Sequence, residues 1–390
     1  MQLTNKVILI ISQQDWGPMF ISKHHYALEL AKKGNCVYFL NGPHQGNKLK
    51  IGEINIKRIE NPGLYIINHR FFFPYKFKFH FRFLYEKLVS VHSRRILLKI
   101  EKRIDIIWSF DISDTMPFEN FSNESAYKIF MPVDLNLHPE AIENARKANL
   151  ILSVSEQILY QFRDVPVPQY FINHGVADIF IKDEIDVKIN IPKRVGLSGN
   201  FLIPALDRKS LIEIFASNKE IIFELWGAID SNSTNITSPL DDTDDARAFI
   251  EGIKKLNNVI IHGQTTTPEL AKGLKRMDAF LIAYKTDSDS NEVTNSHKIL
   301  EYLGNGKVII SNKIATYQNR PELIQMVSEK NRTDNLVSLF KNVTSNLEYH
   351  NNSDFQRIRI RYATEHIYSK QIDNICKLIG QNSLENKNSW

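Results

Sequence analysis

Short apolar runs alternate with amphipathic, helix-length segments along most of the chain, which is the pattern of a parallel sheet covered by helices. The strands predicted in the first half are 7–12, 36–40, 104–110, 127–133, 150–154 and 170–173. The helices predicted between them are 21–33, 139–148 and 156–162. A charged segment that contains Pro192, residues 181–194, then interrupts the alternation and is predicted to be a linker.

After this segment the same alternation begins again. The predicted strands are 195–197, 221–226, 259–262, 279–284 and 307–311, and the predicted helices are 209–217, 268–276 and 296–303. Two successive sheets of this kind predict an α/β fold with two Rossmann-like lobes facing each other across a cleft. The expected domains are 1–180 and 195–365. Residues 354–379 predict one or two amphipathic helices, and the last residues, 382–390, are expected to fray.

Composition narrows the class of protein. The chain has 390 residues, 43% apolar and 24% charged, with a net charge of +5, so it is long enough for two cores but too weakly basic to indicate a nucleic-acid binder. Two cysteines, Cys36 and Cys376, exclude a disulfide framework and fit a reducing cytoplasm. The opening residues read as a strand and not as a signal peptide, and no run approaches the ~20 apolar residues of a membrane span. Membrane association is therefore expected to be peripheral.

Residues 278–312 hold the strongest candidate chemistry. A predicted strand, a polar loop and a predicted helix place Lys298 and Glu301, three residues apart, on one helix face near its start. In open α/β sheets ligands bind where strands end and helices begin, and the positive end of a helix favours phosphate. A solvated ion pair on an exposed helix face would give the same pattern, so both interpretations stay open.

The first strand and helix enclose a loop with a single glycine, Gly17. Neither the dinucleotide G-x-G-x-x-G pattern nor the P-loop pattern is present, which argues against a nicotinamide enzyme or an ATPase. Lys23, His24 and His25 open the helix beside this loop. They are either solvated first-turn residues or substrate contacts at the end of the strand.

Residues 68–103 interleave aromatic and basic side chains. The phenylalanines are Phe71, Phe72, Phe73, Phe77, Phe79, Phe81 and Phe83, and the basic residues among and after them include Arg70, Lys76, Lys78, Arg82, Lys87, Arg94 and Arg95. Phenylalanines at alternate positions need an apolar cover, which is either the core of the protein or a lipid interface. Binding to an anionic membrane surface is therefore one of two open interpretations.

Other sites are excluded by spacing. The run D-x-D-x-N at 287–291 resembles the start of a calcium loop, but Glu292 and Lys298 stand where Gly and Glu are needed. The histidines never take a zinc-binding spacing, and no G-x-S-x-G nucleophile motif occurs. The polar insertion 231–245 is predicted to be a solvated surface loop.

The run NEVTNSHKILEYLGNGKVIIS at 291–311 resembles a motif of the two-lobed, nucleotide-sugar-dependent glycosyltransferases called GT-B. Four further segments are similar to motifs of this family and follow in the family's order. They are KANLILSVSEQ at 147–157, NHGV at 173–176, GLSGN at 196–200 and NVIIHGQTTTPEL at 258–270. The resemblance is greatest to the branch that builds bacterial cell-surface polysaccharides such as teichuronic acid. It implies a cytoplasmic glycosyltransferase that uses a glycan or lipid-linked acceptor, at the inner face of the plasma membrane if 68–103 contacts lipid.

The resemblance also implies roles for single residues. Glu301 would accept hydrogen bonds from the ribose hydroxyls of the donor, and Lys298 would neutralise its diphosphate. Gly199 and Asn200 would offer backbone N–H groups to the same phosphates, with Asn295 and Ser296 also assigned to the donor site. Asp134, His24 and His25 would engage the acceptor or the transferred sugar. No cofactor beyond the donor and no metal ion are expected, and residues 366–390 are expected to cross back to the first domain as a helix.

Two departures from the family pattern keep other functions open. Val293 stands where many retaining members have a second Glu, with Glu292 beside it. The run FLIPALDR at 201–208 replaces a motif with Arg and Lys, for which Arg208 and Lys209 are candidate substitutes. The alternatives are an epimerase of the same fold acting on a nucleotide sugar, and an inactive homologue that acts as an assembly partner.

Overall fold

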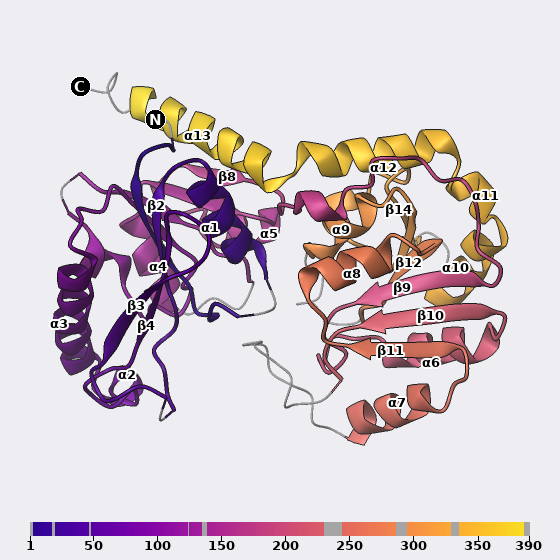
Figure 1. Ribbon diagram of the computed structural model, residues 1–390, viewed down its shortest axis with the longest axis horizontal. Helices are drawn as coiled ribbons and strands as arrows, with labels where there is room; N and C mark the ends of the chain where they lie inside the picture. Colours follow the sequence, from indigo (N-terminus) through magenta and orange to yellow (C-terminus); the bar gives the residue numbers. More distant parts are fainter. Residues whose placement is uncertain are drawn as a thin grey trace. The chain divides into compact units, whose positions relative to one another are not determined.

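The computed structural model describes residues 3–17, 20–46, 48–123, 125–134, 139–229, 244–285, 295–328 and 335–385. The chain forms two compact units, which are described separately (Figure 1). The first consists of Met1–Asn173 together with Tyr368–Trp390, and the second of His174–Ile367. The segment 181–194 lies within the second unit, and the end of the chain belongs to the first.

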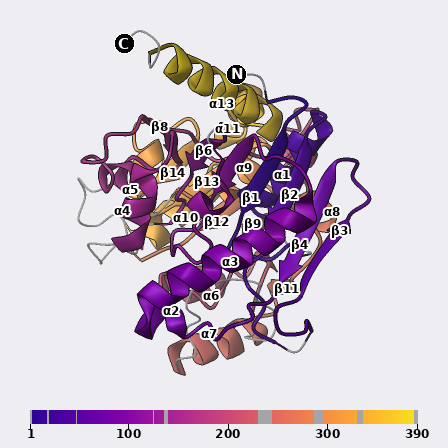
Figure 2. The ribbon, with the colours of Figure 1, turned by 90° about the vertical axis from the view of Figure 1, so that its left-hand side faces the viewer.

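The first unit is a mixed sheet with helices on its faces. Its strands are β1 (Val7–Ile11), β2 (Cys36–Leu40), β3 (Ile54–Arg58), β4 (Leu64–His69), β5 (Ile106–Ser109), β6 (Tyr127–Phe130), β7 (Leu150–Ser153) and β8 (Gln169–Phe171). Its helices are α1 (Ser22–Lys32), α2 (Phe77–His80), α3 (Arg82–Ile100), η1 (Phe118–Phe121), α4 (Pro139–Arg146), α5 (Glu156–Tyr160) and α13 (Tyr368–Glu385). Figure 2 shows α2 and α3 in front of the strands.

Among the described residues this sheet has eight strands in the order β3-β4-β2-β1-β5-β6-β7-β8, and only the edge pair β3 and β4 is antiparallel. The chain runs from β1 outward to β2 and later returns to place β5 on the other side of β1. The loops that follow β1 and β5 therefore meet at the carboxyl edge of the sheet. Such a switch point is where open α/β sheets bind ligands.

The second unit is a parallel sheet. Its strands are β9 (Lys193–Ser198), β10 (Ile221–Trp226), β11 (Val259–Gly263), β12 (Ala279–Ile282), β13 (Val308–Ser311) and β14 (Ile324–Met326). Its helices are η2 (Asp178–Phe180), α6 (Arg208–Ser217), α7 (Asp244–Lys254), α8 (Thr267–Leu274), α9 (Lys298–Leu303), η4 (Ala315–Tyr317), α10 (Leu336–Ser345), α11 (Leu347–His350) and α12 (Ser353–Glu365). The strand order β11-β10-β9-β12-β13-β14 places the switch point between β9 and β12.

Alternating burial on the strands builds the cores. In β12, Ala279 and Leu281 join the apolar cluster on one face of the sheet, while Phe280 and Ile282 join the cluster on the other. The first unit has one large cluster, to which α13 contributes Ile372 and two further isoleucines. The helix at the end of the chain is therefore part of the first core.

Several predicted boundaries are wrong. The helix predicted to begin at about Ser296 begins at Lys298, because His297 lies in a turn that precedes the helix. The strand predicted over 195–197 already begins at Lys193, which pairs with Ile221, so the end of the predicted linker is part of the sheet. The two tail helices are confirmed as α12 and α13. Part of the predicted surface loop 231–245 and the D-x-D-x-N run lie outside the described residues.

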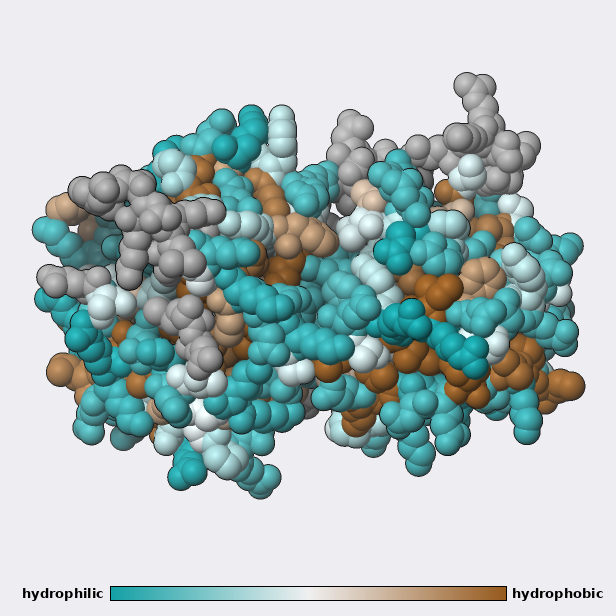
Figure 3. Space-filling model, turned by 90° about the horizontal axis from the view of Figure 1, so that it is seen from above, coloured by the Kyte–Doolittle hydropathy of each residue, from teal (hydrophilic) through white to brown (hydrophobic). Residues whose placement is uncertain are grey.

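No helix of the described residues is long and apolar enough to cross a membrane. The face drawn in Figure 3 is largely hydrophilic, with smaller hydrophobic groups between the polar residues.

Candidate functional site

The first candidate site lies in the second unit, at the switch point between β9 and β12. The loop that follows β9 pairs with the end of the β12 segment through an antiparallel bridge between Leu206 and Tyr284. The N–H of Lys285 donates to the carbonyl of Ala205 at 2.8 Å, which closes this junction. The predicted residues Gly199 and Lys298 are thereby brought to one edge of the sheet.

Lys298 lies against the backbone of Gly199. Its ammonium group donates to the hydroxyl of Tyr284 at 2.9 Å, and the nitrogen lies 5.4 Å from the centre of that ring. A Cβ atom at Gly199 would come within 2.5 Å of the Lys298 nitrogen, and Gly199 has a φ of +140° that side chains rarely adopt. Burial disfavours the charge, but Tyr284, Tyr302 and Glu301 outweigh it and raise the pKa of Lys298. Lys298 is therefore a fixed cation at this edge.

Gly199 differs from its predicted role. Its N–H donates to the carbonyl of Trp226 at 2.9 Å, so this group is already used within the sheet and does not face a ligand. The close approach of Gly227 to the Gly199 carbonyl leaves no room for a side chain at 227 either. The contribution of Gly199 to the site is the space that it leaves for Lys298.

Tyr302 joins α9 to the end of β9. Its hydroxyl accepts a hydrogen bond from the N–H of Ser198 at 2.6 Å and lies 2.8 Å from the Ser198 hydroxyl. Its ring stacks on Phe280 with the ring centres 4.2 Å apart. The helix that carries Lys298 and Glu301 is thus fixed to the loop that carries Gly199 and Asn200.

Glu301 is a buried carboxylate without a hydrogen-bond partner among the described residues. Its exposed fraction is 9%, and its nearest cationic candidate is the Nε2 of His297 at 3.9 Å. Burial raises the pKa of Glu301 to about 7, although the charge of Lys298 acts in the opposite direction. A carboxylate held in this way has acceptor capacity available for a ligand that donates hydrogen bonds.

The remaining predicted donor residues lie around this pair. The side-chain oxygen of Asn200 accepts from the N–H of Leu202 at 2.9 Å, while its amide nitrogen is buried and has no partner in the described chain. The carbonyl of Asn295 accepts from the Nε2 of His174 at 2.8 Å, and that of Ser296 accepts from the N–H of Ile299 at 3.0 Å. Asn200 therefore presents an unused donor, whereas the described contacts of Asn295 and Ser296 are made by their backbones.

His174 is a neighbour that the sequence did not assign to the site. It belongs to the NHGV motif, and burial lowers its pKa to about 4, so it is neutral near pH 7. Its ring centre lies 6.1 Å from that of His297. Arg208, the candidate substitute for a missing arginine, is buried and pairs with Asp245 at 3.0 Å. It serves the packing of α6 against α7.

A second polar cluster occupies the switch point of the first unit. The side chain of Gln13, after β1, donates to the Oδ1 of Asp111, after β5, at 2.7 Å, and it also contacts Ser113. The other carboxylate oxygen of Asp111 accepts from the N–H of Met116 at 2.8 Å. These contacts join the two loops that meet at the carboxyl edge.

Lys23 is the buried cation of this cluster. Its exposed fraction is 2%, it donates to the side chain of Gln14, and its nitrogen lies 5.5 Å from the ring centre of Phe110. Burial lowers the pKa of Lys23 to about 8, against the opposing charges of Asp134 and Asp111. Asp134 itself is exposed and follows β6, so it is the accessible carboxylate near this buried amine.

The structure gives His24 contacts within the fold. Its Nδ1 accepts from the N–H of Ile21 at 3.1 Å, and its Nε2 lies 3.1 Å from the carbonyl of Asp15. Its ring stacks between Phe20 and Phe39, and burial lowers its pKa to about 4. Both ring nitrogens are thus engaged by the backbone, which leaves no nitrogen for a substrate in this arrangement.

His25 faces the last helix. Its ring stacks on Tyr368 of α13 with the centres 4.8 Å apart, and burial lowers its pKa to about 4. The local signal that selected both histidines was their position beside the first loop. The neighbouring Lys23 shares that position and is the residue that joins the polar cluster.

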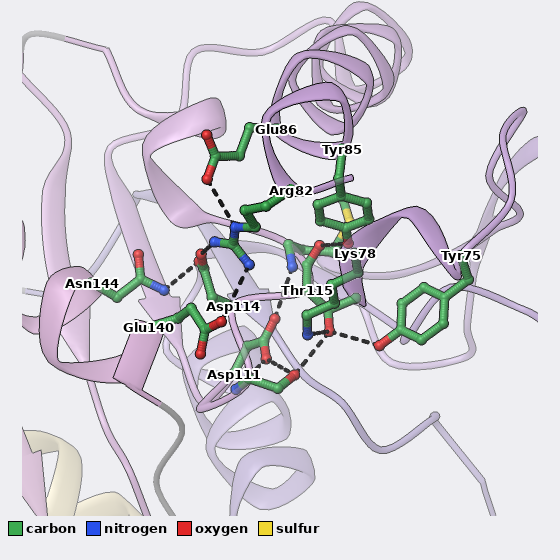
Figure 4. A network of polar contacts seen from close by, with 12 residues as sticks. Tyr75, Lys78, Arg82, Tyr85, Glu86, Asp111, Asp114, Thr115, Glu140 and Asn144 are labelled. Atoms are coloured by element: carbon green, nitrogen blue, oxygen red, sulfur yellow. Dashed lines mark hydrogen bonds and ion pairs between the residues drawn. The ribbon is translucent and has the colours of Figure 1, made fainter. Parts of the chain in front are cut away.

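Figure 4 shows a network that connects this cluster to α2 and α3. The ammonium group of Lys78 donates to the hydroxyl of Thr115 at 2.9 Å. Arg82 forms an ion pair with Asp114 at 2.7 Å, and Asn144 donates to the same carboxylate. Desolvation raises the pKa of Asp114, against its contacts with Asn144 and Arg82. The network ties the aromatic and basic segment to the carboxyl edge of the sheet.

Among the side chains that the structure describes, no group of three or more His, Cys, Asp or Glu residues could hold a metal ion. The polar side chains described at the two switch points carry amines, amides and single carboxylates.

No protein-family model matches the chain, and no curated protein sequence matches it either. Solved structures do match. The sucrose-phosphate synthase of Thermosynechococcus elongatus is 12% identical with a TM-score of 0.69, and the match covers 96% of this chain and 98% of that one. The Anabaena protein HepE in complex with UDP and glucose is also 12% identical, with a TM-score of 0.63. The match covers 96% of this chain and 99% of that one. A UDP-forming trehalose-phosphate synthase of Burkholderia xenovorans in complex with glucose-6-phosphate is 12% identical, with a TM-score of 0.65. The match covers 95% of this chain and 99% of that one.

The likeness extends over nearly the full length of each protein, so it includes both units and not a single sheet. At this level of identity it establishes the fold. The chain therefore has the two-unit α/β fold of the GT-B class.

Proposed function

We propose that this protein is a glycosyltransferase that moves a sugar from a nucleotide-sugar donor to a glycan or lipid-linked acceptor. The observation that carries the proposal is that Lys298 and Glu301 lie on the same helix at the switch point of the second sheet. Lys298 supplies a fixed cation, and Glu301 supplies a buried carboxylate that can still accept hydrogen bonds. A nucleoside diphosphate sugar offers a phosphate group for the first and ribose hydroxyls for the second.

In this proposal each residue has a separate task. The Glu301 carboxylate accepts hydrogen bonds from the ribose hydroxyls, and the Lys298 ammonium binds the diphosphate. The unused amide donor of Asn200 lies on the loop that Tyr302 fixes to α9, so it is a further candidate for a phosphate oxygen. Asn295 and Ser296 keep their proposed place at the donor, beside the start of α9.

The chemistry benefits from this arrangement because the nucleoside diphosphate leaves with increasing negative charge. A cation that is already in place stabilises that charge more in the transition state than in the ground state. We expect no cofactor beyond the donor and no metal ion, since Lys298 supplies positive charge at the leaving group.

The acceptor is assigned to the first unit. We place it at the edge where Gln13, Asp111 and Lys23 meet, with Asp134 as the exposed carboxylate that engages the acceptor or the transferred sugar. His24 and His25 are left out of this role because their rings are held by the fold.

The structural neighbours support the donor class. One is a complex with UDP and glucose, and another is named as a UDP-forming synthase. A further neighbour is a galactosyltransferase of the lipopolysaccharide outer core, with a TM-score of 0.59 and 15% identity over 96% of this chain. Together with the resemblance of the motifs, this favours a cytoplasmic transferase, hexosyl in type, of bacterial surface polysaccharide synthesis.

A thermal-shift panel of nucleoside diphosphates and their sugars tests the donor site. Binding to the folded state raises apparent stability by ~2.7 kcal/mol at a hundredfold excess of ligand over Kd. Lys298→Ala and Glu301→Gln should each weaken nucleotide binding about tenfold or more, since each removes a charge-assisted hydrogen bond. Lys272→Ala, an exposed lysine on α8, is the matched control and should bind as the unaltered protein does.

Unchanged binding in both site variants would refute the assignment. Conversion of a bound nucleotide sugar into an isomer without any acceptor would show an epimerase, and tight binding with neither reaction would show an inactive homologue. Release of free nucleoside diphosphate only when an acceptor glycan or lipid is present would support glycosyl transfer.

We also propose that α2 and α3 form a surface for an anionic membrane. Phe79, Phe81 and Phe83 are 68%, 58% and 71% exposed, and Leu98 is 76% exposed. Lys87 lies with its ammonium group 4.2 Å from the ring centre of Phe83, so a basic group accompanies the exposed aromatic surface. Exposed aromatic and basic side chains together are typical of interfacial membrane segments.

Sedimentation with anionic vesicles tests this surface. Lys87→Glu together with Arg94→Glu, both exposed on α3, should abolish binding at low salt, since each basic residue contributes ~1 kcal/mol. The pair Lys255→Glu and Lys272→Glu makes the same change of charge in the second unit and should leave binding intact. Equal loss in both pairs, or no binding by the unaltered protein, would contradict the proposal.

A further inference from the structure

An aromatic pocket opens at the carboxyl edge of the first sheet, beside the acceptor cluster. It has a volume of about 410 Å³, within the range of ~300–1,000 Å³ that is typical of small-molecule sites. Its walls come from the segments that follow β2 and β4, two neighbouring strands of the sheet, of which β2 also pairs with β1. None of the proposed donor or acceptor contacts uses it.

Three consecutive phenylalanines form its apolar wall. The rings of Phe71 and Phe73 stack with their centres 4.6 Å apart, and Phe72 meets Phe73 edge to face at 5.1 Å. Phe71 and Phe73 also pack against Tyr85 of α3, at 6.1 and 5.7 Å, and both are buried. The wall is therefore closely packed and apolar, which suits a hydrocarbon chain.

The other side of the pocket is cationic. Arg70 donates to the carbonyls of Gly46 and Leu49 at 3.0 and 2.8 Å, and within the described residues no carboxylate forms an ion pair with it. The Nε2 of His44, also in the lining, is buried and has no hydrogen-bond partner in the described chain. An uncompensated guanidinium and an unused ring nitrogen together favour an anionic group with several acceptor oxygens.

Tyr75 connects the pocket to its two neighbours. Its hydroxyl lies 3.2 Å from that of Thr115, which lies 2.8 Å from the hydroxyl of Ser113 in the acceptor cluster. Its ring meets Phe79, on the exposed aromatic surface, edge to face at 5.7 Å. The pocket thus lies between the surface assigned to the membrane and the edge assigned to the acceptor.

We propose that this pocket binds the apolar chain of a lipid-linked acceptor, with the phosphate of that lipid next to Arg70 and His44. The proposal rests on the function proposed above and makes its acceptor more specific: an amphiphile with a hydrocarbon chain and a phosphate head, not a free glycan. The chain packs on the Phe71–Phe73 wall, and Arg70 and His44 hold the phosphate.

Calorimetric titration with n-alkyl phosphates, below their critical micelle concentrations, tests the pocket on the full chain. In a series from hexyl to decyl phosphate the affinity should rise about fourfold per methylene until the pocket is filled. Decyl glucoside, which has a neutral head, should bind at least tenfold more weakly than decyl phosphate. Equal affinities of the two would overturn the assignment of the phosphate to Arg70 and His44.

Ile51→Glu is the decisive variant. Ile51 lines the pocket and is 71% exposed, so a carboxylate there leaves the core intact while repelling the phosphate and removing apolar wall. Affinity for decyl phosphate should fall at least tenfold. Tyr160→Glu, at a comparably exposed apolar residue of α5 that belongs to none of the proposed sites, is the matched control and should bind decyl phosphate normally.

The two variants separate the pocket from the other proposals. Equal loss of decyl phosphate binding in both, or in neither, would overturn the pocket assignment. Nucleoside diphosphate binding should be the same in both variants and in the unaltered protein, because the donor site lies in the second unit. A failure of the donor proposal would appear as absent nucleotide binding in all three proteins, independently of the amphiphile titration.

Discussion

Glu301 shows how a single buried group links binding to pH. Burial raises its pKa to about 7, well above its usual value of 4.5. The folded protein therefore holds a proton on this carboxyl between about pH 4.5 and 7, where the unfolded chain does not. This contribution to stability is fully present below pH 4.5 and is lost as the pH rises through 7. The proposed binding of the donor requires the ionised carboxylate instead, because it is the stronger hydrogen-bond acceptor.

We accordingly predict that affinity for a nucleoside diphosphate sugar rises between pH 6 and 8. The expected increase is about tenfold, the difference between a hydrogen bond to a charged and to a neutral acceptor. The sugar-bearing diphosphate has no group that titrates in this range, so the change reports on the protein. Glu301→Gln should bind weakly at both pH values, and a variant with the unaltered pH profile would disprove the role.

At this scale the sequence predicted which of the proposed donor residues lie close together, but not how the proposed acceptor residues are held. The placement of Lys298 and Glu301 on one helix was predictable because their spacing is a local property, and that of Gly199 directly after a strand because its motif is short. Whether His24 can contact a substrate depends on Phe20, Phe39 and the carbonyl of Asp15, which the fold brings around its ring. No local pattern distinguishes such a histidine from one that faces a substrate.

The first turn of α1 places two neighbours in opposite roles. His24 is stacked and hydrogen-bonded, so His24→Ala should lower the free energy of unfolding by about 2–4 kcal/mol while nucleotide affinity stays unchanged. Lys23 is a buried amine, and Lys23→Met should be at least as stable as the unaltered protein at pH 7 yet lose transfer to acceptor. Chemical denaturation and transferase assays measure both.

The pKa of Lys23 adds a second signature. Burial lowers it to about 8, so below pH 8 the folded state carries the cost of a buried charge, and stability rises as the pH goes from 8 towards 10.5. Lys23→Met should lack this rise. A difference in stability between the two proteins that is constant from pH 7 to 10 would show that Lys23 is not buried as an amine.

At the scale of helices and strands, the sequence failed to predict elements whose first residues do not follow the helical or strand period of apolar positions. The alternate phenylalanines at 77–83 suggested one covered face, but the chain forms α2 and α3 there, with a break at Phe81. The buried stripe of α3 begins only at Tyr85 and continues through Val89 and Ile96. The antiparallel pair β3 and β4 at one side of the sheet and the helix α7 were also missed, whereas the central strands β1, β5 and β6, which are continuous apolar runs, were predicted.

At the scale of the whole molecule, the first unit depends on the end of the chain. Ile372, Ile375 and Ile379 of α13 are completely buried in its core. A chain that ends at Ile367 loses roughly 5–9 kcal/mol of apolar burial, which is comparable to the stability of a whole domain. We predict that its first unit unfolds while the second stays folded.

Hydrogen exchange resolved by peptide measures this directly. Protection should vanish in β1 and β5 of the truncated chain and persist in β9 and β12. A chain that ends at Gln381, after the last of these isoleucines, is the control and should keep protection in both units. Retained protection of β1 in the chain ending at Ile367 would show that α13 is not needed by the first core.

The discontinuous first unit also sets an order of events during synthesis. Its last helix begins about 200 residues after Asn173, so at ~5–20 residues per second the ribosome needs roughly 10–40 seconds to supply it. The second unit, which is continuous in sequence, is complete before the first can close over its apolar face. During that interval the apolar surface on which the isoleucines of α13 pack is exposed on the first unit. We therefore expect chaperones to bind the nascent chain at this surface.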